Sequence, residues 1–504
     1  MNDYLLPLLV FSPVIGMIMI WLMPKTEEKT LKQFGWIGTL MPLLISLFLY
    51  QQWLTGVSLS SYQIKWDWIQ FGNLAMYDDT LYTIDFELSL DGFSLVFILL
   101  TTVLSMLAAL ASFYIKTEWK GYFLLFLLLE IGMLGVFMAD NLLLFFLFFE
   151  VTFVSLFFLI GRWGYVNKEK AAYHFLVYNG IGSVLLLFVI ATLFVRVGTT
   201  NIDALTHILN VGDVALLAPI SPFLTDMLCI LLFIAFAIKL PVFPFHSWMV
   251  RVHREAAPPV VMLHAGVLLK IGAYGMIRFG LGIFPEQVEK LALLFMIVGV
   301  ISFLYGAFLA LVQTDLKLVW AYSSVSHMGI VFFGFGTLND AGLQGAVFQA
   351  VSHGAIAALL FFLIALLYER TGTTELNELG GLAEHLPIFS GVLLTAGLAA
   401  LGLPGMSGFI SEFMAFLGLF KEQMLLAIIA VIGLILTAAY TLRAVLKITF
   451  GKKTYSMTWR DVQGIEYVPI AILFMVIVAI GVYPMWLGQL VQEDITTWLL
   501  RIGG

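Results

Sequence analysis

The stretch Val267-Leu268-Leu269-Lys270-Ile271-Gly272 places one lysine in the middle of an apolar run that extends over residues 258–283. A helix of about 20 apolar residues is long enough to cross the hydrocarbon core of a bilayer. A charged side chain near the bilayer centre is energetically costly, and such residues are retained mainly where they pair or take part in transport. The stretch therefore predicts a membrane-spanning helix whose lysine has a function.

Similar apolar runs follow one another along almost the whole chain. Of its 504 residues, 61% are hydrophobic and 11% are charged, whereas soluble domains contain about 25% charged residues. The sequence predicts an all-α polytopic membrane protein with about 14 transmembrane helices. We place these spans at residues 4–23, 34–54, 89–113, 119–138, 141–161, 174–196, 223–240, 258–283, 290–313, 317–337, 343–369, 388–417, 423–449 and 465–490.

Lysine and arginine are divided unevenly between the two sides of this arrangement. The chain has 25 Lys and Arg residues. Seventeen of them fall in or beside the loops on one side of the membrane, six fall on the other side, and Lys239 and Lys270 lie inside spans. Cytoplasmic loops carry an excess of Lys and Arg. We therefore expect a multi-pass protein of the inner (plasma) membrane, with the N- and C-termini on the outer side. The first span lacks a basic start and a cleavage site, so we expect it to be retained.

Several classes of site are absent from the sequence. Cys229 is the single cysteine, which excludes disulfide scaffolds, iron–sulfur ligation and cysteine-based zinc sites within this chain. The sequence contains no Walker A motif, no dinucleotide fingerprint and no basic patch for nucleic acid. We expect no cofactor in this chain and no nucleic-acid partner.

Residues 56–87 differ from the rest because polar, aromatic and β-branched side chains alternate there, with acidic residues at Asp78, Asp79 and Asp85. Alternation of this kind predicts a β-hairpin-like loop on the outer surface. The loop could contact a neighbouring subunit, although an exposed loop is the simpler expectation. Residues 1–113 then form an N-terminal unit of three helices that carries this loop.

Two spans are interrupted by helix-breaking residues. The seventh reaches Lys239 and meets Pro241 and Pro244, and the twelfth contains Gly402-Leu403-Pro404-Gly405 before Glu412. Paired discontinuous helices indicate a transporter built from inverted repeats. We expect two inverted five-helix repeats with one discontinuous helix each. They occupy residues 119–283 and 290–449, and residues 465–504 form a C-terminal helix and tail.

Five of the ionisable residues inside the predicted spans are candidates for a function in transport. The alternative to transport is a structural role, in which these residues form ion pairs or the lysines extend their amines to the membrane interface. Lys270 is too far from either end of its span to reach the interface. Apolar burial disfavours a charged amine and a nearby carboxylate favours it, so a lysine–glutamate pair can load and release a proton. The candidate relay residues are Glu150, Lys239, Lys270 and Glu412, with Glu130 as a weaker fifth.

Two histidines add capacity for proton transfer. His327 and His353 lie within the tenth and eleventh spans, and imidazole titrates near neutral pH and can pass a proton between its two nitrogens. A hydrogen-bonded core histidine is an equally good interpretation of each one alone. His174, His246, His253 and His264 are weaker candidates, and no pair has the spacing of a metal site.

Taken together, several stretches resemble the antiporter-like proton-channel subunits of respiratory complex I (NADH:quinone oxidoreductase), most closely the NuoM or mitochondrial chain 4 type. The resemblance covers nearly the whole chain. It rests on residues 127–137, 145–150, 237–241, 245–248, 253–258, 265–275, 321–329, 401–405, 408–413 and 481–484.

The resemblance implies that Glu150 is the carboxylate partner, Lys239 the channel lysine and Lys270 the connecting lysine. It further implies that His327 and His353 are relay histidines and that Glu412 is the residue at the outward exit. Related subunits tend to carry lysine at that last position. The repeats would then hold a hydrated, charged axis through the membrane centre.

The resemblance also implies a function: a subunit that translocates protons and is driven by redox chemistry in other chains of the enzyme. NADH, FMN, iron–sulfur clusters and quinone would belong to partner subunits. This chain would contact other membrane subunits and lipid and would carry protons, and whether it also carries Na⁺ stays open. Two alternatives stay open. One is a Na⁺(K⁺)/H⁺ antiporter subunit of a multi-subunit antiporter, and the other is the equivalent subunit of a membrane-bound hydrogenase or ion-coupled carbon-uptake complex.

Overall fold

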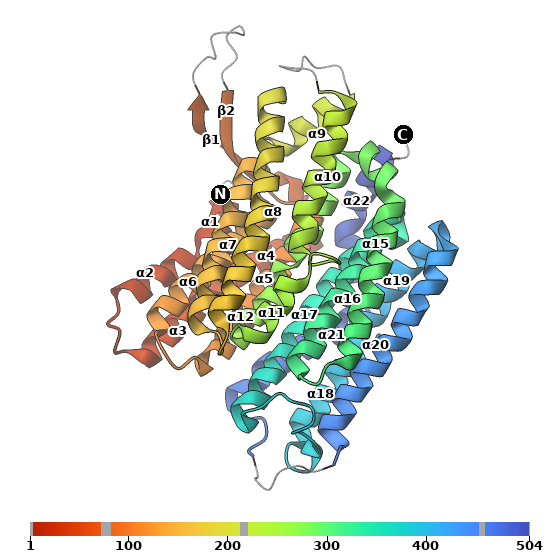
Figure 1. The fold of residues 1–504 in the computed structure, drawn as a ribbon. Helices are drawn as coiled ribbons and strands as arrows, with labels where there is room; N and C mark the ends of the chain where they lie inside the picture. Colours follow the sequence, from red (N-terminus) through yellow and green to blue (C-terminus); the bar gives the residue numbers. More distant parts are fainter. Residues whose placement is uncertain (1–3, 72–81, 212–219, 453–458, 503–504) are drawn as a thin grey trace.

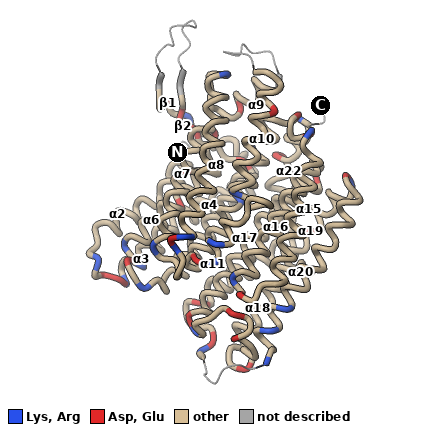
Figure 2. The backbone as a smooth tube through the Cα atoms, in the orientation of Figure 1, with Lys and Arg blue, Asp and Glu red and all other residues tan. Residues whose placement is uncertain are grey.

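The computed structural model describes residues 4–71, 82–211, 220–452 and 459–502. Long helices pack side by side, and a two-stranded β-hairpin projects from one end (Figure 1). We call this end the hairpin end and the opposite one the far end. The start of α1 and the end of α22 both lie toward the hairpin end (Figure 1). Charged residues concentrate in loops and near helix ends (Figure 2).

The N-terminal part contains the first three spans and the hairpin. The chain bends by 40° between α1 and α2, just before Pro13. The elements are α1 (Leu5–Phe11), α2 (Pro13–Leu22), α3 (Glu28–Gly38), α4 (Leu40–Leu54), η2 (Leu59–Ser61), β1 (Gln63–Phe71), β2 (Tyr82–Ser89), α5 (Gly92–Ala111) and η3 (Ser112–Tyr114).

The two antiparallel strands lie in the stretch for which the sequence predicts a hairpin. Trp66 stands opposite Phe86, and an irregularity at 67–69 shifts the register. The amine of Lys65 lies 2.9 Å from Asp85 and 2.8 Å from Glu87, so cross-strand ion pairs reinforce the ladder. Residues 78 and 79 of the acidic cluster lie outside the described residues.

The remaining helices follow in order. The next segment comprises α6 (Trp119–Met138), α7 (Leu142–Trp163), α8 (Lys168–Val197), α9 (Ile202–Val211), α10 (Pro222–Lys239), α11 (Ser247–Glu255), α12 (Pro258–Leu263), η4 (His264–Leu268), α13 (Lys270–Gly275), η5 (Met276–Gly280) and α14 (Leu281–Ile283). The last comprises α15 (Pro285–Val312), α16 (Leu316–Gly336), α17 (Asp340–Thr371), η6 (Leu382–Glu384), α18 (Pro387–Ala400), α19 (Ser407–Glu422), α20 (Met424–Phe450), η7 (Gly464–Glu466), α21 (Tyr467–Val482) and α22 (Met485–Ile502).

The number of spans agrees with the sequence analysis. Within the described ranges, 12 helices are long and apolar enough to cross a membrane, and the bent pair α1–α2 brings the number to 13. Helix α18 is a shorter apolar helix, and residues 401–406 separate it from α19. One boundary differs: the predicted span 465–490 ends at Val482, and α22 is a separate helix. Pro484 has no backbone N–H to continue α21, so the chain turns there.

Two matching turns occur at corresponding places in the segments 119–283 and 290–449. Gly198-Thr199-Thr200 follows α8, and Gly372-Thr373-Thr374 follows α17; both glycines have positive φ, 85° and 75°. The N–H of Leu142 donates to the Thr200 carbonyl at 2.8 Å, and the N–H of Leu316 donates to the Thr374 carbonyl at 2.9 Å. The same backbone contact therefore begins α7 and α16.

The two turns lie at opposite ends of the molecule. The first is at the hairpin end, because the N–H of Asp140 donates to the carbonyl of Glu87 in β2 at 3.0 Å. The second lies beside α18 at the far end (Figure 1). Equivalent helices of the two segments therefore run in opposite directions through the bundle.

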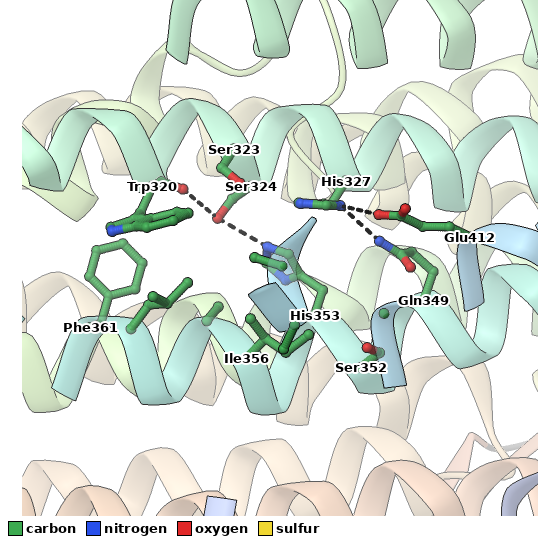
Figure 3. Close-up of a pocket in the computed structure, with 15 residues that line it drawn as sticks. Trp320, Ser323, Ser324, His327, Gln349, Ser352, His353, Ile356, Phe361 and Glu412 are labelled. Atoms are coloured by element: carbon green, nitrogen blue, oxygen red, sulfur yellow. Dashed lines mark hydrogen bonds and ion pairs between the residues drawn. The ribbon is translucent and has the colours of Figure 1, made fainter. Parts of the chain in front are cut away.

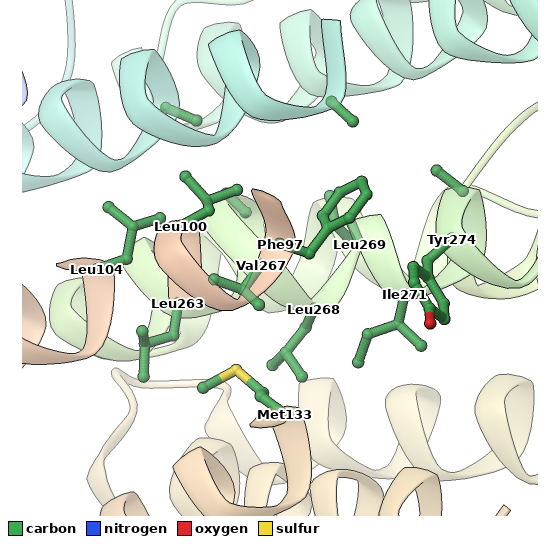
Figure 4. Packing of buried hydrophobic residues seen from close by; sticks show 14 of the residues in the cluster. Phe97, Leu100, Leu104, Met133, Leu263, Val267, Leu268, Leu269, Ile271 and Tyr274 are labelled. Atoms are coloured by element: carbon green, nitrogen blue, oxygen red, sulfur yellow. The ribbon is translucent and has the colours of Figure 1, made fainter. Parts of the chain in front are cut away.

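The helical run that carries Lys270, residues 258–283, lies in the middle of the bundle, and its most apolar 18-residue stretch is completely buried. A helix that is apolar on all sides packs inside other helices. Phe97, Leu100 and Leu104 of α5 face it from one side, and Met133 of α6 lies near Leu268 (Figure 4). The neighbours on every side hold this helix, and thus Lys270, at the centre of the fold.

Candidate functional site

Lys239 is the last residue of α10, directly before the break that separates α10 from α11. Its side chain is 1% exposed, and its amine has no hydrogen-bond partner among the described residues. The amine lies 4.8 Å from the ring centre of Phe149 and 5.8 Å from that of Phe175. Contacts of this kind attract a cation but cannot receive its proton.

Glu150 follows Phe149 on α7 and is partly buried. Its carboxylate accepts a hydrogen bond from the hydroxyl of Ser183 on α8. No ion pair of 4.0 Å or less joins Glu150 to Lys239 in the described structure. The two groups are near enough to interact electrostatically, but a direct hydrogen bond between them is not formed in this state.

Lys270 begins α13, immediately after the π-helical turn η4. Its side chain is fully buried, and its amine contacts the carbonyl oxygen of Ala265 and lies 2.8 Å from Nδ1 of His353. π-Helical turns occur frequently at functional sites because they re-aim neighbouring side chains. Lys270 is thus in direct contact with the other half of the bundle through α17.

His353 continues this contact into α16. Its Nε2 lies 3.1 Å from the hydroxyl of Ser324, and that hydroxyl donates to the carbonyl of Trp320 at 3.0 Å. The ring centre of His353 lies 5.6 Å from that of His327 (Figure 3). The two histidines therefore face the same small space from neighbouring helices.

His327 connects this space to α19. Its Nδ1 lies 2.9 Å from Nε2 of Gln349 and 3.5 Å from Oε1 of Glu412 (Figure 3). The side-chain oxygen of Gln349 accepts a hydrogen bond from Ser411, the residue before Glu412, at 2.5 Å. Glu412 is 6% exposed. The break before α19 therefore brings a carboxylate to the buried histidine.

A cavity of about 20 Å³ lies between these side chains and is lined by His327, His353, Gln349, Ser324 and Glu412, among others. One water molecule needs about 10 to 15 Å³ of such space and two or more polar partners. The cavity therefore has room for a water molecule that bridges the two histidines and the carboxylate. A proton can pass along such a bridge without any movement of the helices.

Glu130 stands apart from this arrangement. It lies on α6, is fully buried, and neither carboxyl oxygen has a hydrogen-bond partner among the residues that the structure describes. No direct contact joins it to Lys239, Lys270 or the histidines. The structure thus brings four of the seven predicted residues together in or beside one cavity, namely Lys270, His353, His327 and Glu412. Glu150 and Lys239 lie near enough to interact electrostatically but make no direct contact.

The chain matches a known family over most of its length. The family described as "NADH:quinone oxidoreductase/Mrp antiporter, TM" matches residues 139–437, which is more than half of the chain. The chain belongs to this family. The matched region contains every relay candidate except Glu130.

The family relationship extends to curated relatives and to a solved structure. The chain is 35% identical over 482 residues to NADH-quinone oxidoreductase subunit M of Rickettsia prowazekii (strain Madrid E), covering 94% of each. It is 35% identical over 488 residues to NADH-ubiquinone oxidoreductase chain 4 of Chondrus crispus, covering 95% of this chain and 94% of that one. A chain of respiratory complex I from Thermus thermophilus with bound NADH superposes with a TM-score of 0.86 and 28% identity, covering 99% and 100%.

Several side chains of this family member contact the relay candidates and were not singled out from the sequence. They are the hydroxyls of Ser183 and Ser324 and the amide of Gln349, and Ser411 in turn donates to Gln349. A lone serine on an apolar helix carries no signal of its own, because its partner depends on which helix it faces. The pair His253 and His264 had only weak support in sequence, yet the two rings are in direct contact.

Among the described residues, no group of three or more His, Cys, Asp or Glu side chains could hold a metal ion. The polar groups at the centre of the bundle are amines, imidazoles, carboxyls, hydroxyls and amides. Each of them can donate or accept a proton or a hydrogen bond. What this arrangement can do chemically is hold protons and pass them on.

Proposed function

We propose that this chain is the proton-translocating subunit M of a NADH:quinone oxidoreductase of the complex I type. Redox chemistry in other subunits drives protons along the buried residues Glu150, Lys239, Lys270, His353, His327 and Glu412. Glu130 supplies a further carboxyl beside this path. The chain contributes to an enzyme complex and carries out no redox step itself. The family membership and the named relatives support this proposal.

One observation carries the mechanism. The contact from Lys270 to His353 crosses from one half of the bundle to the other, and His353, His327 and Glu412 line one cavity. A purely structural core would bury apolar side chains there, because buried polar groups add little net stability. A connected set of titratable groups at this depth is suited to proton transfer.

We also propose how the chain is divided and placed. Residues 1–113 form the N-terminal unit with the hairpin at 56–87, residues 119–283 and 290–449 form the inverted repeats, and residues 465–504 form the C-terminal helix and tail. The matching turns after α8 and α17 support this division. The protein spans the inner (plasma) membrane with its hairpin end and both termini on the outer side, as the distribution of Lys and Arg suggests.

In this assignment the lipid bilayer and other membrane subunits of the complex surround the chain. NADH, FMN, iron–sulfur clusters and quinone are bound by partner subunits, and this chain binds none of them. The same family includes Mrp antiporters, so Na⁺(K⁺)/H⁺ exchange is the competing function, followed by a role in a membrane-bound hydrogenase or carbon-uptake complex. The subunit M and chain 4 relatives favour the first assignment.

The test is purification of the native complex through a tag on this chain, followed by measurement of NADH-driven proton pumping in vesicles. We expect NADH:quinone oxidoreductase activity to co-purify, and Lys270→Ala to abolish the pumping that depends on this subunit at normal assembly. Na⁺/H⁺ exchange without co-purified NADH oxidation would overturn the assignment in favour of the antiporter.

A further inference from the structure

Asn179 is a polar residue on α8 that the path described above does not include. Its side chain is 1% exposed and lies within a long apolar helix. The amide nitrogen donates to the carbonyl of Phe175, one turn earlier, at 3.1 Å. This bond fixes the orientation of the amide, because the reversed orientation would place two oxygens against each other. The side-chain oxygen is therefore the free end of the amide.

This oxygen and the amine of Lys239 have opposite deficits. Among the residues that the structure describes, Oδ1 of Asn179 is buried and accepts no hydrogen bond, and the buried amine of Lys239 donates none. Buried polar atoms are normally satisfied, so each of these needs an explanation. An acceptor without a donor and a donor without an acceptor thus occur on α8 and α10, two helices that pack against each other.

Contacts on both sides of Asn179 place it level with Lys239. One turn before it, the ring centre of Phe175 lies 5.8 Å from the amine of Lys239. One turn after it, a Cβ atom at Gly182 would lie 3.4 Å from the carbonyl oxygen of Ala235 on α10. Residues three and four apart share a helix face. Asn179 therefore belongs to the face of α8 that packs against the end of α10.

The same part of α8 also contacts the helix beyond the break. The hydroxyl of Ser247, the first residue of α11, donates to that of Tyr178 at 3.0 Å. The ring of Phe175 packs against that of Trp248 on α11 at 5.6 Å. Helix α8 thus contacts both parts of the broken helix, and Asn179 lies at the level of the break.

The next turn of α8 contacts the carboxylate partner. Ser183 follows Asn179 by four residues, and its hydroxyl donates to Glu150. Three successive turns of one helix therefore carry a ring beside the amine of Lys239, a free acceptor, and the hydroxyl that binds Glu150. The structure shows the amine and the carboxylate apart, with a separate polar group of α8 available to each.

We propose that Asn179 is a positioning residue that holds the protonated amine of Lys239 while this amine is separated from Glu150. This inference rests on the proposed function. An ammonium group has three N–H donors, and an amide oxygen accepts through two lone pairs. The amide itself takes no proton. The amine moves between the carboxylate of Glu150 and the oxygen of Asn179, and the proton travels on the lysine.

The alternative is that Asn179 only packs. An apolar side chain of similar size would then serve better, because it would bury no oxygen without a partner. The rings of Phe149 and Phe175 attract the ammonium through their faces but offer no lone pair to its N–H groups. An acceptor for Lys239 gives the buried oxygen a role that packing leaves unexplained.

The test uses two substitutions of the same shape, only one of which keeps an acceptor. In Asn179→Thr the hydroxyl can donate to the carbonyl of Phe175, as Thr192 on the same helix donates to Phe188 at 2.8 Å, and its oxygen can still accept from Lys239. Asn179→Val lacks this oxygen. Thr192→Val is the matched control, since it removes a hydroxyl elsewhere on α8. The measurement is protons pumped per NADH oxidised by the intact complex, at assembly levels matched by native gel.

We expect Asn179→Thr to keep most of the pumping, and Asn179→Val to fall toward the level of Lys239→Ala. The control should pump normally. A packing role would not separate the two variants, because threonine and valine fill the same space. Equal pumping by Asn179→Thr and Asn179→Val, whether normal or defective, would therefore overturn the inference. An equal defect in Thr192→Val would also overturn it, since any loss of a hydrogen bond on α8 would then suffice.

These outcomes leave the proposed function intact as long as Lys239→Ala is defective. Normal pumping by Lys239→Ala would instead remove the proposed function on which the inference depends. If Asn179→Val fails to assemble, Asn179→Ala takes its place in the comparison. Failure of both to assemble, or of Asn179→Thr, would assign the residue a structural role and overturn the inference.

Discussion

Nδ1 of His327 lies 3.5 Å from Oε1 of Glu412, so an imidazole on α16 and a carboxyl on α19 face each other at a distance slightly longer than a hydrogen bond. The other end of the axis differs. There the amine of Lys239 faces the ring of Phe149, and the carboxylate of Glu150 contacts Ser183. The titratable groups are therefore close neighbours at the Glu412 end of the axis, whereas Lys239 and Glu150 at the other end have no direct contact.

The first prediction concerns this amine. Lys239→Ala should abolish pumping by the assembled complex because it removes the buried amine that ends α10 at the break. Lys239→Arg should also impair it, since a guanidinium does not release its proton in proteins and cannot act as a relay. The measurement is NADH-driven pumping in vesicles, corrected for the amount of complex in the membrane.

Lys290→Ala is a matched control, because this lysine lies on α15 with a largely exposed side chain. The control should pump like the unchanged protein. Full pumping by Lys239→Arg would contradict the lysine mechanism, whereas equal loss in Lys239→Ala and Lys290→Ala would point to a general effect of charge on assembly.

The second prediction separates proton transfer from packing at Glu150. Glu150→Gln keeps the size and can still accept from Ser183, but it cannot take a proton as a carboxylate does, so pumping should fall strongly. Glu150→Asp should retain part of it. Ser183→Ala removes the hydrogen bond to the carboxylate and should have an effect between the two.

Native gels decide how these variants are interpreted. If Glu150 only packs, the Gln and Asp variants should both lower the amount of complex while pumping per complex stays normal. That outcome would remove Glu150 from the proton path and assign it a packing role only.

The sequence predicted the positions of the spans well because bilayer thickness and helix-breaking residues decide them. The fourth span was placed at 119–138 and the eighth at 258–283, the same residues that form α6 and the helical run from α12 to α14. The breaks after Lys239 and before Glu412 followed from proline and glycine. In each case a local physical cause was visible in the chain itself.

The contacts within the site could not be predicted in the same way. Which residue meets Lys270 depends on how α13 faces α17, and no local pattern encodes the rotation of one apolar helix against another. The pairing of Glu150 with Ser183 rather than with Lys239 is an example. The motif Gly-Thr-Thr occurs twice in the sequence, at 198–200 and 372–374, and in the structure each copy makes the same backbone hydrogen bond. This motif could have indicated from the sequence alone that the two segments correspond.

The third prediction concerns Asp494 on α22, a helix outside the apolar spans at the hairpin end. Burial raises the pKa of Asp494 to about 7, and the negative charge of Asp91 adds to the shift, although Arg278 opposes it. An exposed aspartate titrates near about 4. Between these values the folded protein holds a proton that the unfolded chain has lost, so stability falls as pH rises toward 7 and is constant above it.

Asp494→Asn should remove this dependence. The amide oxygen can still accept from the N–H of Phe93, a bond of 2.8 Å in the structure. The variant should therefore be more stable than the unchanged complex at pH 8, by at most about 4 kcal/mol at about 1.4 kcal/mol per pKa unit. At pH 5, about one unit above the pKa of the unfolded chain, the gain should shrink to about a third of that. Glu493→Gln, on the exposed neighbour, is the control. An equal shift at both pH values would contradict the linkage.

The last prediction concerns the end of the path at Glu412. The structure buries this carboxyl between His327 and the break before α19, because Oε1 lies 3.5 Å from Nδ1 of His327 and Oε2 lies close against Gly402. The carboxyl therefore joins the wall of the histidine cavity to the break. Glu412→Ala should impair pumping, because no other described carboxyl contacts His327.

Glu412→Lys, the residue that related subunits tend to carry here, should retain a measurable part of the pumping, since an amine can also pass a proton from the histidine. Glu412→Gln separates charge from size: it fills the same space and should behave like the alanine variant. The measurement is pumping in inverted vesicles at matched assembly, with Glu422→Gln at the exposed end of α19 as the control. Normal pumping by Glu412→Ala would exclude Glu412 from the path and leave His327 as its last described member.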